Sequence, residues 1–202
     1  MPHDTRNIIQ RENALLKDEN NRLKQEVSSL RGFVQILTEL SDITGSFTND
    51  EELMPTLRGI LVRAMDLLDA PDGSLALADD TTNELVFVLV LGSLSSRLEG
   101  YRLPSNEGIA GWVFQNRKPA LVRDARRDQR FFASVDEQFR FKTQSVAAAP
   151  LIGNGKAFGV VEVLNQPGDN PFSETDMALL NLLCRFAGEA LADIESRESS
   201  ES

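Results

Sequence analysis

The chain has 202 residues, of which 41% are hydrophobic and 26% charged, and 31 acidic residues against 21 basic ones give a net charge of −10. This composition is that of a soluble globular protein, and the acidic balance argues against sequence-independent binding to nucleic acid or anionic membranes. A single cysteine, Cys184, excludes an intrachain disulfide and a multi-thiolate metal site. The only histidine is His3, so we expect no haem, no metal site and no cofactor.

By pattern the chain divides into three parts. Residues 1–45 are charged and helical, residues 46–194 mix strand and helix periods, and residues 195–202 form a Ser- and Glu-rich tail. Because this tail has nothing to bury, we expect it to be disordered. The beginning of the chain lacks the apolar core of a signal peptide, and no stretch reaches the roughly 20 apolar residues of a membrane span. We therefore expect a cytoplasmic protein without membrane contacts.

A heptad repeat runs through the first part of the chain. Apolar residues recur every seven positions and define the d positions, with the a positions between them. The a and d positions are Ile9, Asn13, Leu16, Asn20, Leu23, Val27, Leu30, Val34 and Leu37. Valine at a with leucine at d favours two strands, and an asparagine at a pairs with its twin only in a matched two-stranded arrangement.

The charges beside this repeat indicate the direction of the two helices. The g positions hold glutamates, and the e positions five residues later are basic. The three pairs are Glu12 with Lys17, Glu19 with Lys24, and Glu26 with Arg31. In a parallel dimer each pair joins opposite charges across the interface, whereas antiparallel helices would bring glutamates together. We therefore predict a parallel homodimer, with a single amphipathic helix packed on its own domain as the alternative.

The second part begins with a predicted helix and a hairpin. Helical spacing of apolar residues covers 50–70, and two apolar strands follow at 74–79 and 84–92, joined by a polar turn. A short helix beginning at Gly108 and an aromatic-rich helical piece near 130–139 come next. These elements form the middle of the predicted domain.

A second hairpin and a long helix complete the domain. Strands at 145–152 and 157–165 flank Asn154-Gly155, a strong signal for a two-residue turn. The last helix starts after Ser173, with Asp176 placed for a variant of the capping box, and runs to about residue 194.

This order predicts an α+β fold. We expect an antiparallel sheet that the first and last helices of the domain cover on one face and the short middle helices on the other. A sheet covered on both faces makes Glu162 conspicuous, because its strand neighbours are Val161 and Val163. A carboxylate at that position needs a partner.

The segment GIAGWVFQNR, followed by GVVEVLNQ and PFSETDMALL, resembles the GAF domains of cyclic-nucleotide phosphodiesterases and bacterial signalling proteins. The resemblance covers about 50–194. The phosphodiesterase signature of Asn-Lys, a later Phe and then Asp-Glu maps to Asn165, Phe172 and Asp176. Gln166 and Met177 replace its Lys and Glu, so the Lys–Asp bridge of that family cannot form here.

The resemblance implies a ligand pocket between the sheet and the middle helices, which act as its lid. The residues that it implies for binding are Gly108, Ile109, Ala110, Gly111, Trp112, Phe131, Phe132 and Glu162. The glycines either leave the N–H groups of a helix start open to an anion or only make a tight joint between loop and helix. The aromatic residues either stack on a planar ligand or belong to the core.

Charge leaves two further alternatives open. The window from Arg117 to Lys142 holds eight basic and four acidic residues, which makes it locally positive. These arginines either favour an anionic ligand or pair with Asp124 and Asp128 on a solvated face. Glu162 either accepts a hydrogen bond from a ligand or is satisfied by one of the arginines.

No nucleophile with a base, metal cluster or phosphate-binding loop is visible in the sequence, so we predict a protein that is not an enzyme. We expect a homodimeric signalling protein that senses a small molecule, with cyclic nucleotides and other anions among the candidate ligands, and acts on a separate effector protein. The alternative is a ligand-free scaffold for dimerisation or protein docking.

Overall fold

The computed structural model describes residues 53–93, 95–168 and 172–201, and also positions 12, 13, 15–17, 19, 20, 23 and 24, which are helical. The chain forms two compact units, Met1–Ser41 and Asp42–Ser202. In the first unit, Leu16 and Leu23 of the predicted coiled coil are 57% and 48% exposed. Five predicted interface positions lie outside the described residues: Ile9, Val27, Leu30, Val34 and Leu37.

The second unit is built on a six-stranded antiparallel sheet with the strand order β3-β2-β1-β6-β5-β4. The strands are β1 (Asp72–Asp79), β2 (Glu84–Leu91), β3 (Arg102–Pro104), β4 (Ala120–Val122), β5 (Val146–Gly153) and β6 (Lys156–Leu164). Both predicted hairpins, β1–β2 and β5–β6, are confirmed. Asn154 and Gly155 have φ angles of 47° and 76°, which a type I′ turn requires.

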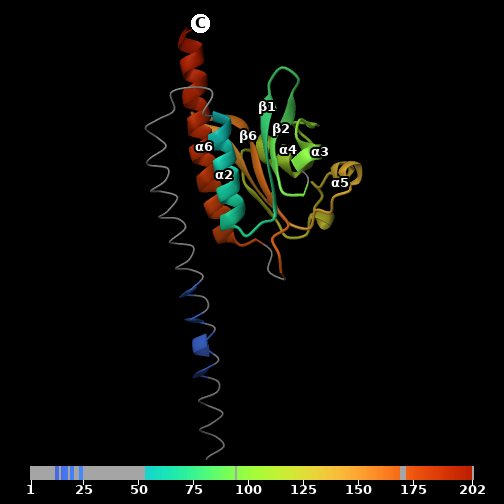
Figure 1. Ribbon diagram of the computed structural model, residues 1–202, viewed down its shortest axis with the longest axis vertical. Helices are drawn as coiled ribbons and strands as arrows, with labels where there is room; N and C mark the ends of the chain where they lie inside the picture. Colours follow the sequence, from blue (N-terminus) through green and yellow to red (C-terminus); the bar gives the residue numbers. More distant parts are fainter. Residues whose placement is uncertain are drawn as a thin grey trace, which may run out of the picture. The chain divides into compact units, whose positions relative to one another are not determined.

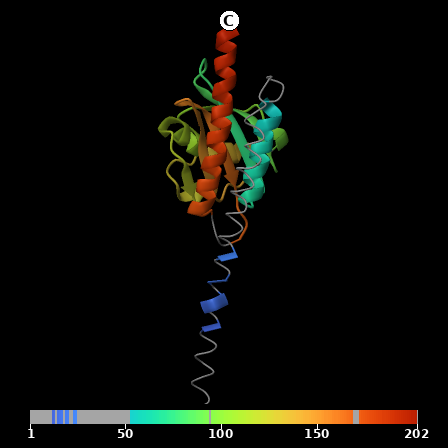
Figure 2. The ribbon, with the colours of Figure 1, turned by 90° about the vertical axis from the view of Figure 1, so that its left-hand side faces the viewer.

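Helices cover both faces of this sheet (Figure 1). They are α2 (Leu53–Leu67), α3 (Ser95–Leu98), α4 (Gly108–Asn116), α5 (Ala133–Phe139) and α6 (Glu174–Glu201), with a 3-10 turn at η2 (Ala125–Arg127). Helices α2 and α6 contact each other and pack on one face, while α4 packs on β5 and β6 from the other. Figure 2 shows α6 crossing the face that it covers. The predicted α+β fold is therefore confirmed.

Helix α6 begins as the sequence predicts. The Ser173 hydroxyl donates to Asp176 Oδ2 at 2.8 Å, the Ser173 backbone N–H donates to the same oxygen at 2.7 Å, and the Asp176 N–H donates to Ser173 Oγ at 3.2 Å. This reciprocal pattern satisfies donors that the first turn of a helix leaves free.

The end of α6 differs from our expectation. We predicted a disordered tail from residue 195, but the helix continues to Glu201. One ion pair lies past the predicted end of the helix: Lys156 on β6 pairs with Glu195. Among the described residues, no helix combines the length and apolarity that crossing a membrane demands.

Candidate functional site

A cavity of about 80 Å³ lies between the sheet and the short helices of the lid. Its walls are mostly apolar and include Phe87 on β2, Ile109 on α4 and Val146 on β5. Four polar side chains interrupt this apolar surface: Ser74, Asp136, Thr143 and Glu162. The cavity therefore resembles a small-ligand site in character, with a few polar groups placed on an apolar surface.

Glu162 reaches the cavity because of its register in the sheet. It lies on β6 opposite Ser74 of β1 and Ala148 of β5, so the three side chains share one face. Val161 and Val163, its neighbours in sequence, point to the opposite face by the alternation of a strand, where α6 and α2 pack on the sheet. The strand that looked almost wholly apolar thus buries valines on one side and presents a carboxyl group on the other.

Glu162 is partly buried, and few groups compensate its loss of hydration. The Ser74 hydroxyl donates a hydrogen bond to Glu162 Oε2 at 3.4 Å, a long one. Among the residues that the structure describes, no basic side chain pairs with this carboxyl group, so the predicted alternative of an arginine partner is wrong. Desolvation raises the pKa of Glu162 from 4.5 to about 7, and the Ser74 hydrogen bond lowers it only in part.

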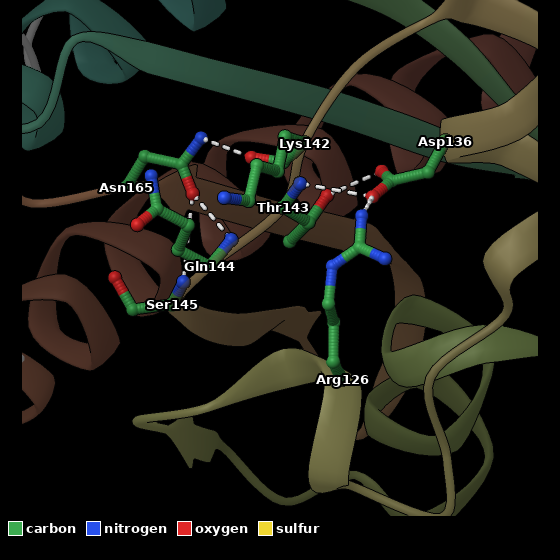
Figure 3. Close-up of polar contacts among 7 residues, drawn as sticks. All are labelled: Arg126, Asp136, Lys142, Thr143, Gln144, Ser145 and Asn165. Carbon is green, nitrogen blue, oxygen red and sulfur yellow. Dashed lines mark hydrogen bonds and ion pairs between the residues drawn. The ribbon is translucent and has the colours of Figure 1, made fainter.

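Asp136 on α5 is the second carboxyl group at the cavity, and its hydrogen bonds are well satisfied (Figure 3). Its oxygens accept from the Thr143 hydroxyl at 2.6 Å, from the Thr143 N–H at 2.9 Å and from Arg126 at 3.4 Å. Because Asp136 is only 6% exposed, these bonds act in a poorly hydrated site. They tie the lid helix α5 to the loop before β5.

Asn165 holds the same segment from the other side (Figure 3). Its Oδ1 accepts from the backbone N–H of Gln144 at 2.7 Å, and its side-chain amide donates to the Lys142 carbonyl at 3.0 Å. Asn165 has a φ of 62°, a conformation that asparagine tolerates better than most residues. The asparagine that we mapped to the family signature therefore fixes the loop that carries Thr143.

Six of the eight residues predicted for ligand binding border the cavity. They are Gly108, Ile109, Ala110, Phe131, Phe132 and Glu162. Gly111 and Trp112 do not border it. A Cβ atom at Gly111 would lie 2.8 Å from the Asn106 carbonyl carbon, so this glycine makes the tight joint between loop and helix that we gave as the alternative.

Trp112 and two arginines of the positive window, Arg127 and Arg130, pair with protein groups. The Arg130 guanidinium lies 4.4 Å from the centre of the Trp112 ring and forms two hydrogen bonds to the Asp128 carboxylate, at 2.8 and 2.7 Å. This contact holds the pKa of Asp128 below its usual range and raises the pKa of Arg130. Arg127 pairs with Asp124 at 3.2 Å. Arg127 and Arg130 thus show the pairing with Asp124 and Asp128 that we gave as the alternative, on an exposed face for Arg127 and partly buried for Arg130.

Sequence reasoning missed three of the polar groups at the cavity. In the sequence analysis Asp136 counted only as one charge of the positive window, and Thr143 and Ser74 were not singled out. Ser74 could have been found by aligning the two predicted hairpins, because it lies directly opposite Glu162. Thr143 depends on a loop whose path the sequence does not predict.

A curled antiparallel sheet with a helical lid and a half-open, mostly apolar cavity defines a class of small regulatory domains. The family model of the GAF domain matches residues 52–191, so the chain belongs to the GAF domain family. The GAF domain of a phosphoenolpyruvate-protein phosphotransferase from Coxiella burnetii superposes with a TM-score of 0.71 at 22% identity, over 84% of this chain and 98% of that one. This likeness shows the shared fold.

Two curated relatives are phosphodiesterases. The dual 3',5'-cyclic-AMP and -GMP phosphodiesterase 11 of Drosophila melanogaster is 25% identical over 174 residues, covering 79% of this chain and 12% of the relative. The cGMP-specific 3',5'-cyclic phosphodiesterase of Drosophila mojavensis is 24% identical over 195 residues, covering 90% and 17%. The chain thus spans less than a fifth of either relative, and what is matched in this chain is its GAF domain, a signalling and regulatory module.

Proposed function

We propose that this GAF domain senses a small molecule in the cavity beneath α4 and α5 and passes the result to an effector protein without catalysing a reaction. One observation carries the proposal: Glu162, a carboxyl group with a strongly raised pKa, faces a half-open, mostly apolar cavity and has only one weak partner. Perturbed ionisable groups in cavities mark binding sites more often than ordinary core positions.

The size of the cavity argues for a compact ligand. Sites for drug-sized molecules usually enclose about 300 Å³ or more, whereas this cavity measures about 80 Å³. A cyclic nucleotide would have to displace the lid, against the hydrogen bonds that tie Asp136 to Thr143. Gln166 is also engaged elsewhere, since its amide donates to the Leu68 carbonyl at 2.8 Å. We therefore favour a molecule smaller than the cyclic nucleotides named for the relatives.

We propose further that the protein works as a parallel homodimer joined by its N-terminal heptads. The exposure of Leu16 and Leu23 supports this, because apolar side chains at d positions gain most when a second helix covers them. In the proposed dimer, a change in the lid would reach the effector through the sheet and the helices behind it.

A ligand-free scaffold is the second candidate function. The small volume of the cavity favours it, because a domain that only docks other proteins needs no larger space. A scaffold predicts a stable protein partner, and it loses support if the purified protein carries a bound metabolite.

Thermal melting against a panel of compounds tests the sensor proposal. The panel holds cyclic nucleotides, cyclic dinucleotides, small carboxylic acids and small amines. A compound present at one hundred times its Kd should add about 2.7 kcal/mol to the free energy of unfolding. If no compound shifts the melting curve, the ligand-free scaffold becomes the better proposal for the function.

A cavity-filling variant shows whether such a shift comes from this site. Ala110→Leu places three more carbon atoms in the cavity wall, while Ala133→Leu makes the same change at an exposed position of α5. We expect the first variant to lose the ligand-induced shift and the second to keep it. Circular dichroism checks that both fold.

A further inference from the structure

The hydrogen-bonding capacity left free in the cavity lies on Glu162. Asp136 and Thr143 satisfy each other through bonds of 2.6 and 2.9 Å, with Arg126 as a third partner. Glu162 accepts one bond, from Ser74 at 3.4 Å, although a carboxylate offers about four acceptor positions. A ligand that donates hydrogen bonds would therefore meet Glu162 with most of its capacity unused.

The charges at the cavity favour a cation. The ionisable side chains that border it are Glu162 on β6 and Asp136 on α5, both carboxyl groups. Arg126, the basic residue nearest in the hydrogen-bond network, faces Asp136 and makes no contact with Glu162. Two arginines of the positive window, Arg127 and Arg130, pair with Asp124 and Asp128. An anionic ligand would thus be repelled, whereas a cation would be attracted in a medium of low dielectric constant.

The remaining walls of the cavity determine the size and the apolar character of the rest of the ligand. They are apolar around the carboxyl groups, with aromatic side chains from Phe87, Phe131 and Phe132. An engineered cavity of about 150 Å³ accommodates benzene, which has six non-hydrogen atoms, so by the same proportion about 80 Å³ holds about three. Because this cavity is half-open, one or two further atoms of a small ligand can lie in its mouth. A short branched hydrocarbon fits both the volume and the lining.

We propose that the ligand of this site is a compact primary ammonium ion with a short apolar body, held by Glu162 with Ser74 beside it. This inference rests on the proposed function and names its ligand class. The ammonium group would donate to the free oxygen positions of Glu162, and the apolar body would contact the phenylalanines of the lid.

The proposal carries a pH dependence. Burial raises the pKa of Glu162 to about 7, so the carboxyl group is largely protonated at pH 5.5 and largely charged at pH 8. Asp136 is the other ionisable group that borders the cavity, and it accepts hydrogen bonds from Thr143 and Arg126. A simple alkylammonium ion stays protonated over this range, so its affinity should rise at least several-fold from pH 5.5 to pH 8.

Three probes of similar size and shape separate the effect of charge: isobutylammonium, isobutanol and isobutyrate. Each is titrated into the ¹⁵N-labelled full chain at pH 8, and the backbone amide signals of Ser74 and Glu162 are followed by NMR. We expect saturable shifts with isobutylammonium and at least tenfold weaker binding of the other two. Glu162→Gln should weaken the binding of isobutylammonium at least tenfold. Glu137 is an exposed acid on the lid helix, so Glu137→Gln should leave this affinity unchanged.

The outcomes separate this inference from the function on which it rests. If isobutanol or isobutyrate binds as tightly as isobutylammonium, or if Glu162→Gln binds it unchanged, the ligand class is wrong while a sensor of another ligand survives. If isobutylammonium does not bind and a cyclic nucleotide shows saturable binding, the inference is overturned in the same way. If no compound of any class binds, the proposed function falls with it.

Discussion

A carboxyl group in the wall of an apolar cavity destabilises the fold when it is charged. Glu162 has a pKa of about 7 in the folded protein, against 4.5 in its ordinary environment, because burial favours the protonated form. The native state therefore binds this proton more tightly than the unfolded state, and stability falls as the pH rises between these two values. Above about pH 7 the charged group costs up to about 3 kcal/mol.

Replacing this carboxyl group should therefore stabilise the protein only at high pH. We predict that Glu162→Gln raises the free energy of unfolding at pH 8 by about 1 to 3 kcal/mol and changes it little at pH 5, where the wild-type group is already neutral. Urea unfolding followed by circular dichroism measures both values. Glu137→Gln should show no such difference, and an equal effect of Glu162→Gln at both pH values would contradict the raised pKa.

The sequence predicted part of this site for a clear reason. Glu162 stands out because a charged residue interrupts an otherwise apolar strand, and strand periodicity alone places it on a covered face. Asp136 does not stand out, because a carboxylate on a short helix looks like a surface charge. Its burial depends on Thr143, which comes close only through the fold of the loop that Asn165 holds.

At the scale of elements, the contact between α6 and β5 depends on two glycines. A Cβ atom at Gly188 would lie 2.3 Å from the Ile152 carbonyl oxygen, and one at Gly153 would lie 1.9 Å from the Gly188 carbonyl oxygen. The helix thus crosses the strand at backbone contact distance. Both short approaches need residues without a side chain.

Two glycine substitutions in helices should have opposite effects. Gly188→Ala forces α6 away from β5, and we expect it to destabilise the protein by about 1 to 3 kcal/mol or more. Gly59→Ala on α2 meets nothing within 4 Å and should stabilise it by about 0.5 to 1 kcal/mol, because alanine favours the helix. Thermal unfolding compares the two, and a neutral Gly188→Ala would mean that the helix does not approach the strand so closely.

The thiol of α6 provides an independent test of how this helix packs. Cys184 has no exposed area, and burial raises the pKa of its thiol. We predict that Ellman's reagent fails to modify the native protein at pH 8 over minutes and modifies one thiol per chain once urea unfolds it. Rapid modification of the native protein would show that α6 separates from the sheet.

Elements with local signals were predicted best. The Asn154-Gly155 turn and the Ser173 cap depend on neighbouring residues, and both form as the sequence indicates. The end of α6 was not predicted, because Ser and Glu residues after 194 carry no apolar stripe. Contacts with other elements, such as the ion pair of Glu195 with Lys156, extend the helix beyond the local pattern.

At the scale of the whole molecule, the two faces of the sheet differ: one is packed by helices, and the other holds the candidate binding site. The sheet's α2 and α6 face is densely packed, whereas its α4 and α5 face keeps a cavity. This division follows from sequence only in outline, since the order of helices and strands predicts which helices share a face but not how well they fill the space beneath them. The size of the cavity is a property of the folded domain.

The dimer prediction belongs to this scale. Deleting residues 1–31 removes most of the predicted heptads, and we expect the mass from light scattering to fall from that of a dimer toward that of a monomer. The GAF domain itself should stay folded, because its own core lies in residues 53–201. An unchanged dimer mass would show that contacts outside residues 1–31 hold the two chains together.

The titration of Glu162 itself tests the central claim, that this cavity is a binding site built around a poorly compensated carboxyl group. The side-chain carboxyl carbon can be followed by ¹³C NMR from pH 4 to pH 9, with Glu162→Gln assigning the signal. We predict a midpoint near 7 in the free protein and a lower one with saturating isobutylammonium, because a bound cation stabilises the carboxylate. A midpoint near 4.5 that the amine does not move would contradict the account.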